Sequence, residues 1–153
     1  MSVPHSFEMT VQVPETDIDP QRHVNNVAFV RYVQDIAVAH WRLVAPAEIQ
    51  KAVTWVVRRH EIEYMRPGMP GDELLLRTWV GEPSGATWDR FTEISRSADS
   101  QLLVKARTVW VLLDAASGRP RRVDAKMIAC FKSGVGNEKE RTFATDESRI
   151  EHG

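Results

Sequence analysis

The sequence predicts an α+β domain in which an antiparallel sheet of about five strands packs around one long buried helix. Apolar side chains recur at helical spacing in one long segment, residues 26–44, whereas four later segments are rich in β-branched and aromatic residues. Short stretches of Gly, Pro, Ser and Asp separate those later segments, and short connections favour antiparallel neighbours.

The first predicted element is a strand at residues 7–13. Apolar and polar residues alternate along it, which is the pattern of a strand with one buried face. Pro14 ends this strand, and the polar residues 15–26 are expected to form a loop. The apolar members of the strand are Phe7, Met9, Val11 and Val13.

Residues 26–44 form the predicted helix. Apolar side chains cover most of its circumference and leave only a narrow polar stripe, which indicates a helix that other elements surround. Asn25 or Asn26 can cap its N-terminus, and Pro46 is expected to close it.

Four further strands and a short helix complete the predicted fold. Residues 133–153 are mostly polar, so we expect one folded domain at residues 1–132 and a loosely attached tail at 133–153. The turn between the second and third of these strands is placed at residues 81–85. The four strands are placed at residues 54–66, 72–81, 86–96 and 101–114, and the short helix at 123–131.

Composition excludes several classes of protein. The 153 residues fit one domain, and 20 Lys and Arg against 21 Asp and Glu give a net charge of -1. That balance argues against nucleic acid or an acidic membrane as a partner. The single cysteine, Cys130, cannot form an internal disulfide, and the sequence contains no cluster of soft metal ligands. No apolar leader or spanning segment is present, so a cytoplasmic location is expected.

The most informative segment is residues 16–26, immediately before the predicted helix. Two carboxylates, a histidine and two adjacent asparagines fall within it, and one asparagine is enough to cap a helix. The plainest interpretation is a polar loop whose Asp and Asn residues serve turns and capping. The polar members are Asp17, Asp19, His23, Asn25 and Asn26.

Two kinds of metal site are conceivable in this segment. A calcium loop starting at Asp17 would place Arg22 where a glycine is needed and Ala28 where a bidentate Glu is needed, so that interpretation fails. A transition-metal site would use His23 but has no second histidine nearby. We therefore expect no metal ion and no cofactor.

A carboxylate beside a helix start can carry out acyl chemistry. Unpaired N–H groups and the helix dipole stabilise a carbonyl oxygen as it becomes negative. An aspartate with the reference pKa of about 3.9 is ionised at neutral pH, so it can attack an acyl carbon or orient a water without a histidine. A thioester suits this weak nucleophile because its thiolate leaves readily.

Two motifs resemble a known family. Residues 17–26 read Asp-Ile-Asp-Pro-Gln-Arg-His-Val-Asn-Asn and are followed by Phe29 and Tyr32, and residues 64–74 read Tyr-Met-Arg-Pro-Gly-Met-Pro-Gly-Asp-Glu-Leu. Both are similar to motifs of the hot-dog fold acyl-CoA thioesterases of the 4-hydroxybenzoyl-CoA thioesterase type. The resemblance covers roughly residues 7–131 and implies a sheet wrapped around one central helix.

The resemblance also implies roles for individual residues. The second aspartate of the family's Asp-x-Asp pair is the catalytic carboxylate, which corresponds to Asp19. The backbone N–H near Asn26 would polarise the thioester carbonyl. His23 and Asn25 match the His-Val-Asn-Asn version of the motif, which also occurs in plant acyl-ACP thioesterases. This sequence departs from many relatives by having Arg22 in place of glycine.

Other residues have a functional and a plainer interpretation. Asp17 is expected to support the loop by hydrogen bonds. Asp35 fits a supporting or substrate-site group, but a solvated helix stripe is its plainer interpretation. The basic turn at residues 119–122 could meet CoA phosphates or simply be solvated. The five tryptophans are interpreted as core and interface packing. They are Trp41, Trp55, Trp79, Trp88 and Trp110.

The predicted function is hydrolysis of a fatty or aromatic acyl-CoA to the free acid and CoA, with Asp19 as base or nucleophile. The alternatives are an acyl-ACP thioesterase, a hot-dog hydratase or dehydratase, and a non-catalytic acyl-thioester-binding module. A domain of this size encloses a deep pocket with difficulty, so we expect a homodimer or homotetramer. Neither nucleic acid nor membrane is expected as a partner.

Overall fold

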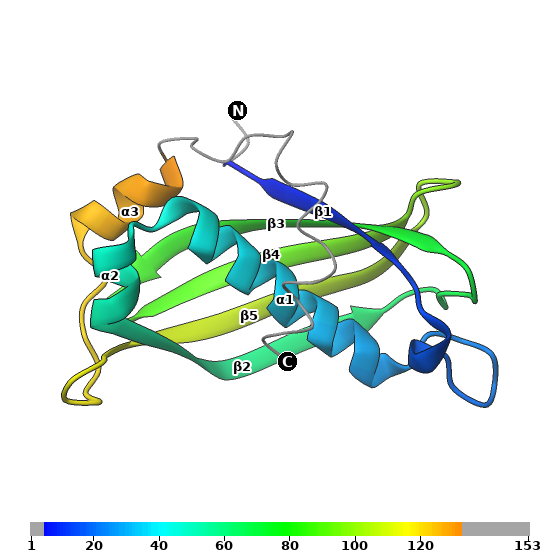
Figure 1. Cartoon of the computed structure of the whole chain (residues 1–153), viewed down its shortest axis with the longest axis horizontal. Helices are drawn as coiled ribbons and strands as arrows, with labels where there is room; N and C mark the ends of the chain where they lie inside the picture. Colours follow the sequence, from blue (N-terminus) through cyan, green and yellow to red (C-terminus); the bar gives the residue numbers. More distant parts are fainter. Residues whose placement is uncertain (1–4, 133–153) are drawn as a thin grey trace.

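The structure, a computed structural model, describes residues 5–132, and the predicted tail at residues 133–153 lies outside them. A long helix crosses one face of a single sheet (Figure 1). The elements in chain order are β1 (Phe7–Gln12), η1 (Glu15–Asp17), α1 (Asn26–Val44), α2 (Ala47–Ala52), β2 (Val53–Tyr64), β3 (Glu73–Ser84), β4 (Thr87–Arg96), β5 (Leu102–Asp114) and α3 (Ala125–Lys132).

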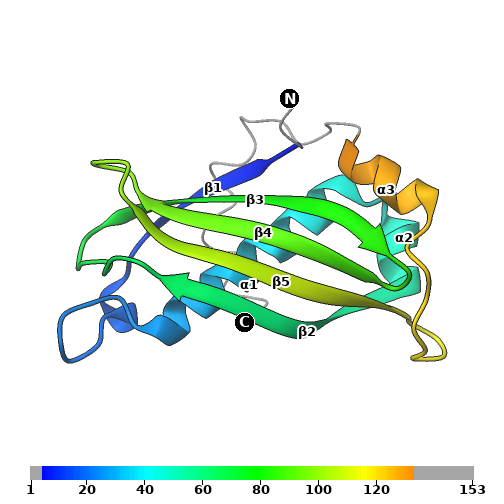
Figure 2. The same cartoon turned by 180° about the vertical axis from the view of Figure 1, so that it is seen from behind.

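The sheet has five strands in the order β1-β3-β4-β5-β2, and every neighbouring pair is antiparallel. Figure 2 shows it from behind, with α1 on the far side of the strands. The predicted α+β class, the strand number and the single long helix are therefore confirmed. The two edges of the sheet are the short β1 and the long β2.

The main core lies between α1 and the sheet. Phe7, Met9 and Val11 of β1, and Val13 just after it, are at most 6% exposed, as the alternating pattern predicted. The side of α1 that faces the strands contributes large side chains, because an amphipathic helix buries its apolar stripe. These side chains include Phe29, Tyr32, Val33 and Ile36, which join Leu74, Leu76 and Ile94 in one cluster.

Both ends of α1 were predicted correctly. Asn25 is the N-cap, because its side-chain oxygen accepts a hydrogen bond from Val27 N at 2.9 Å. The helix ends before Ala45, but the chain then forms α2, which was not predicted. Pro46 explains this omission, since proline is tolerated at the start of a helix as well as just after one.

Two expectations were wrong. In the single chain, the sheet covers only one side of α1, so the helix is not surrounded, and Val27 is 71% exposed. The turn predicted at residues 81–85 is also shorter, because β3 continues to Ser84 through an irregularity in register after Val80. Gly85, at φ +61°, supplies the left-handed backbone that this tighter turn uses.

Candidate active site

The segment between η1 and α1 is a closed loop. An antiparallel bridge joins Ile18 to Val24, and Asp19 N donates to His23 O at 2.8 Å. Asn25 N donates to Asp17 O, also at 2.8 Å. These backbone bonds bring the two ends of the loop together at the start of α1, so its side chains are held in place.

The loop is also attached to the turn between β2 and β3. Val24 N donates to Gly68 O at 2.8 Å. A Cβ atom at Gly68 would lie 2.7 Å from Val24 Cγ2 and 3.2 Å from Phe29 Cζ. Only a residue without a side chain therefore allows this approach.

Arg22 has a left-handed backbone, with φ at +67°. This conformation explains why glycine suits the position, since a non-glycine residue is strained there. The Arg22 side chain pairs with Glu15, and that hydrogen bond raises the pKa of the guanidinium. The loop thus keeps its closed conformation although arginine, and not glycine, occupies this position.

Asp17 is buried behind the loop and faces α1. Its Oδ2 accepts hydrogen bonds from Tyr32 Oη and from Arg31 Nη2, each at 2.5 Å. Burial is the largest single effect on the pKa of Arg31 and lowers it. The hydrogen bond that Arg31 donates to Asp17, together with the charges of Asp17 and Asp35, outweighs burial and raises this pKa. Asp17 thus connects the loop to the second turn of the helix.

Asp19 lies at the opening of the loop and is half-buried. Its Oδ1 accepts the N–H groups of Gln21 at 2.9 Å and His23 at 3.1 Å. Within residues 5–132, no donor lies at hydrogen-bond distance from Oδ2. One carboxylate oxygen therefore fixes the orientation of the side chain and the other is available for chemistry.

A cavity of about 390 Å³ lies beside Asp19. The end of β2 and the residues after it form its other side, and Tyr64 Oη lies 3.4 Å from Asn26 O. The N–H of Asn26, the first residue of α1, has no acceptor within the described residues. The cavity is lined by Asp19, Gln21, His23, Val24, Asn25, Asn26, Phe29, Tyr64, Met65, Arg66 and Pro67.

The structure brings together most of the residues that the sequence singled out. Asp19, His23, Asn25 and Asn26 line one cavity, whereas Asp17 lies behind it. Asp35 is farther along α1 and does not line this cavity.

The basic turn at residues 119–122 lies at the far end of the sheet. Val53 pairs with Asp114, next to this turn, and Tyr64 at the other end of β2 lines the Asp19 cavity. Eleven residues of strand separate the two ends by about 35 Å. Within one chain, these arginines are therefore too far away to contact a substrate group at Asp19.

Sequence reasoning missed Tyr64, Met65 and Arg66 as cavity residues. They open the 64–74 motif, so the signal was present, but the motif was interpreted as a strand-turn-strand signature only. Their position follows from the Val24–Gly68 hydrogen bond, which is a contact between distant parts of the chain.

Asp19 and Asn26 bring a carboxyl oxygen without a donor and a backbone N–H without an acceptor to one cavity, among the described residues. This combination suits attack on a carbonyl carbon, because the N–H can stabilise the oxygen that becomes negative. Among residues 5–132, no group of three or more His, Cys, Asp and Glu side chains is placed to hold a metal ion. No helix in this part of the chain is long and apolar enough to cross a bilayer.

Proteins similar to this chain include thioester hydrolases. The chain is 27% identical over 110 residues to the acyl-CoA thioester hydrolase YbgC of Escherichia coli O157:H7, covering 72% of this chain and 81% of the relative. It is 21% identical over 162 residues to the chloroplastic palmitoyl-acyl carrier protein thioesterase of Gossypium hirsutum, covering 95% of this chain. The matched part is only 39% of the cotton enzyme's length.

The fold matches solved thioesterase structures. A variant of 4-hydroxybenzoyl-CoA thioesterase in complex with 4-hydroxybenzoyl-CoA superposes with a TM-score of 0.73 at 15% identity, covering 83% of this chain and 99% of that one. The resemblance to the hot-dog fold is thereby confirmed. A family model described as the thioesterase-like superfamily matches residues 13–131. The chain therefore belongs to the thioesterase-like superfamily.

Proposed function

We propose that this protein is an acyl-CoA thioesterase that uses Asp19 as general base or nucleophile. The observation that carries the proposal is that Asp19 Oδ2 and the N–H of Asn26 are both unpaired within the described residues and belong to residues lining one cavity. Membership of the thioesterase-like superfamily and the similarity to an acyl-CoA thioester hydrolase support this reaction class.

The chemistry follows from these two groups. Asp19 Oδ2 either attacks the thioester carbon or takes a proton from a water that attacks it. The N–H of Asn26 donates to the carbonyl oxygen, which becomes negative as the new C–O bond forms. The C–S bond then breaks, and the thiolate leaves with its electron pair. It is protonated to CoA by Asp19 in the base route and by water in the nucleophile route. In the nucleophile route, water finally releases the acid from Asp19.

The neighbouring residues would prepare this step. The backbone N–H of His23 donates to Oδ1 of Asp19, and His23 and Asn25 both line the cavity, so both would contact substrate. Asp17 would keep the loop against α1 through Tyr32. Asp35 would act farther back, through the charge of Arg31.

A second candidate activity is hydrolysis of acyl groups on acyl carrier protein. The similarity to the cotton enzyme, which extends over 95% of this chain, favours it. The chemistry at Asp19 would be the same, and only the carrier of the thioester would differ. Parallel assays with one acyl group on CoA and on acyl carrier protein separate the two activities by their kcat/KM values.

We also propose that the chain forms a homodimer through β2. This strand is a 12-residue edge, and exposed edges favour pairing with another chain. Val27, Val56, Tyr64 and Met65 are between 40% and 71% exposed, and they lie on β2, just after it or at the start of α1. Light scattering after size exclusion measures the mass, and a monomer that does not associate at assay concentration would contradict this proposal.

The decisive experiment is a thiol-release assay over aliphatic and aromatic acyl-CoAs with wild type and Asp19→Asn. We expect the substitution to lower kcat on the order of 10²–10⁴-fold, because an amide of the same shape can neither attack the acyl carbon nor take a proton from water. Asp89→Asn is the matched control, since Asp89 pairs with Arg107 away from the cavity. Tight acyl-CoA binding without thiol release in wild type would instead support a binding module.

A further inference from the structure

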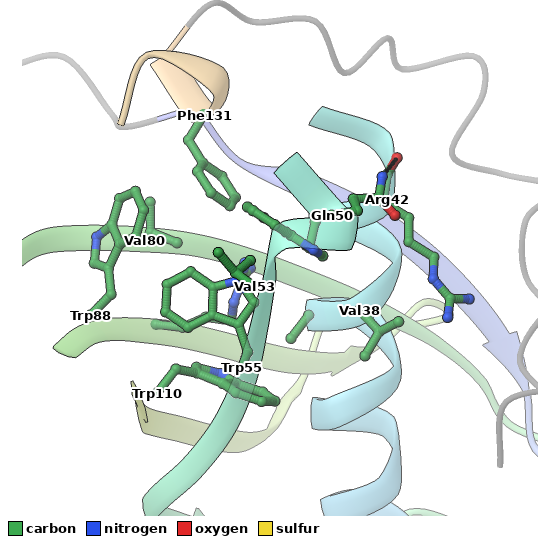
Figure 3. Close-up of a pocket in the computed structure, with 12 residues that line it drawn as sticks. Val38, Arg42, Gln50, Val53, Trp55, Val80, Trp88, Trp110 and Phe131 are labelled. Atoms are coloured by element: carbon green, nitrogen blue, oxygen red, sulfur yellow. Dashed lines mark hydrogen bonds between the residues drawn. The ribbon is translucent and has the colours of Figure 1, made fainter. Parts of the chain in front are cut away.

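A second cavity, of about 270 Å³, lies at the C-terminal half of α1. Four of the five tryptophans line it, together with Phe131 of α3 (Figure 3). Their rings contact one another, with Trp41 and Trp55 edge to face at 5.7 Å and Trp88 and Phe131 at 5.0 Å between centroids. The interpretation of these tryptophans as simple packing missed the space that they enclose. The four are Trp41, Trp55, Trp88 and Trp110.

This tryptophan cavity is separate from the Asp19 cavity within the chain. The two have no lining residue in common. Trp41 follows Asn26 by fifteen positions, which is about 22 Å along α1. Tyr64 follows Trp55 by nine positions, which is about 30 Å along β2. A ligand in the tryptophan cavity is therefore distant from the Asp19 carboxylate of the same chain.

Arg90 places a buried positive charge on this cavity. The residue is 5% exposed and lines the space beneath Phe131, whose ring centroid is 5.7 Å from the guanidinium carbon. Its hydrogen bonds come from Nη1, which donates to His40 Nδ1 and Thr78 Oγ1, each at 3.0 Å. Both acceptors are neutral in this role. Burial alone lowers the pKa of Arg90, to about 9.

No carboxylate compensates this charge within the described residues. Arg90 takes part in none of the ion pairs there, and neither Asp nor Glu lines the tryptophan cavity. Buried cations are normally paired, because an isolated charge loses its hydration without replacement. The site therefore has a positive charge and lacks the anion that would balance it.

A second donor lies on the same cavity. Trp110 Nε1 is buried and has no hydrogen-bond acceptor in the part of the chain that the structure describes. The guanidinium and the indole N–H are both donors, so their complement is an acceptor group with negative charge. The surrounding rings complement an apolar body. Figure 3 shows Trp55, Trp88 and Trp110 on one side of the space, across from α1.

We propose that the tryptophan cavity binds a small free carboxylic acid, with an aromatic ring or a short apolar chain among the tryptophans and the carboxylate on Arg90 and Trp110. The volume of the cavity suits such a ligand. A cavity of about 150 Å³ accommodates benzene, and the tryptophan cavity, at about 270 Å³, leaves room for a carboxylate as well. A carboxylate, with two oxygens that accept in one plane, matches a guanidinium better than other small acceptors do. This site does not depend on thioester hydrolysis at Asp19.

The first test uses wild-type protein and two matched probes. Phenylacetate carries the carboxylate, and phenylacetamide has the same shape without the charge. We expect phenylacetate to quench tryptophan fluorescence and to bind at least about tenfold more tightly in calorimetry, since hydrogen bonds to charged groups are the stronger ones. Equal affinity for the two probes, or no binding of either at millimolar concentration, would overturn the proposal.

Variants then locate the site. Trp110→Phe keeps the ring and removes the donor, so it should weaken phenylacetate binding severalfold with little effect on phenylacetamide. Arg90→Met should abolish the preference for the acid, whereas Arg77→Met, whose arginine pairs with Glu93 and stacks on Trp79, should leave it unchanged. Because Arg90→Met can fail to fold, the wild-type probe ratio and Trp110→Phe decide the question in that case.

Asp19→Asn separates this site from the active site. If phenylacetate occupies the tryptophan cavity, the substitution leaves its affinity unchanged even where it abolishes thiol release. If the acid instead binds beside Asp19, removing the negative carboxylate strengthens its binding and Trp110→Phe has no effect, which would refute the tryptophan-cavity site. Loss of thioesterase activity therefore does not count for or against this proposal.

Discussion

The hydroxyl of Tyr32 donates a 2.5 Å hydrogen bond to Oδ2 of Asp17, and this contact joins the loop that carries Asp19 to the second turn of α1. Tyr32 is fully buried, and Asp17 is 7% exposed. Water cannot replace the bond easily at such a position, so it contributes to stability and to the position of the loop.

Tyr32→Phe should lower the free energy of unfolding by about 1.5–3 kcal/mol, because it leaves a buried carboxylate with one donor fewer. Urea denaturation measures this change. Tyr64→Phe is the matched control, since Tyr64 is 43% exposed and its hydroxyl contact is 3.4 Å long. A similar decrease in the free energy of unfolding in both variants would contradict a specific contribution of the Tyr32–Asp17 hydrogen bond.

Arg22→Gly should raise the melting temperature relative to Arg22→Ala by a few degrees, roughly 2–6 °C. Both variants lose the pair with Glu15, but only glycine accepts the left-handed backbone at φ +67° without strain. Differential scanning calorimetry compares them. Equal melting temperatures would show that the loop changes its backbone conformation when the arginine is removed.

Gly68→Ala should lower kcat and destabilise the fold by about 1–3 kcal/mol, because the new Cβ would overlap Val24 Cγ2. Thiol-release kinetics and urea denaturation follow the two effects. The double variant with Val24→Ala removes the overlapping atom and should recover part of the loss. Strictly additive effects of the two substitutions would contradict direct contact as the cause.

Stability should decrease below neutral pH because of His60. Burial lowers the pKa of His60 from its usual 6.5, and Nδ1 lies 2.9 Å from Thr108 Oγ1. The unfolded chain therefore binds the proton first, so stability is lost as pH falls from about 6.5 towards the folded pKa and is constant again below it. Urea denaturation from pH 7.5 to 5 should show a smaller loss for His60→Asn, and an unchanged loss for His5→Asn, which alters an exposed histidine.

Local chemistry made most of the fold predictable. Alternation along β1 and the cap at Asn25 are properties of neighbouring residues, so they could be read directly. The turn at residues 81–85 was misplaced because Gly and Pro usually mark turns, whereas here Pro83 lies within β3, beyond its register irregularity. The end of β3 is set by its pairing with β4, and a contact between strands cannot be read from the residues of one segment.

The site was predictable where it lies within one segment. Asp19, His23, Asn25 and Asn26 are neighbours along the chain, and they line one cavity. Residues that reach the site from elsewhere, such as Arg66, could not be placed without the tertiary contacts. The tryptophan cavity could not be predicted for the same reason. Its lining residues are scattered along the sequence from α1 to α3, and no periodicity connects the tryptophans.

α1 serves two cavities that have no residue in common. Energetic effects of substitutions at such a distance usually add, so changes at one end of the helix need no compensation at the other. Evolution or protein engineering can therefore alter the choice of acyl group beside Asp19 and the choice of ligand beside Arg90 as independent traits. A library that varies both ends together should behave as the product of two smaller ones.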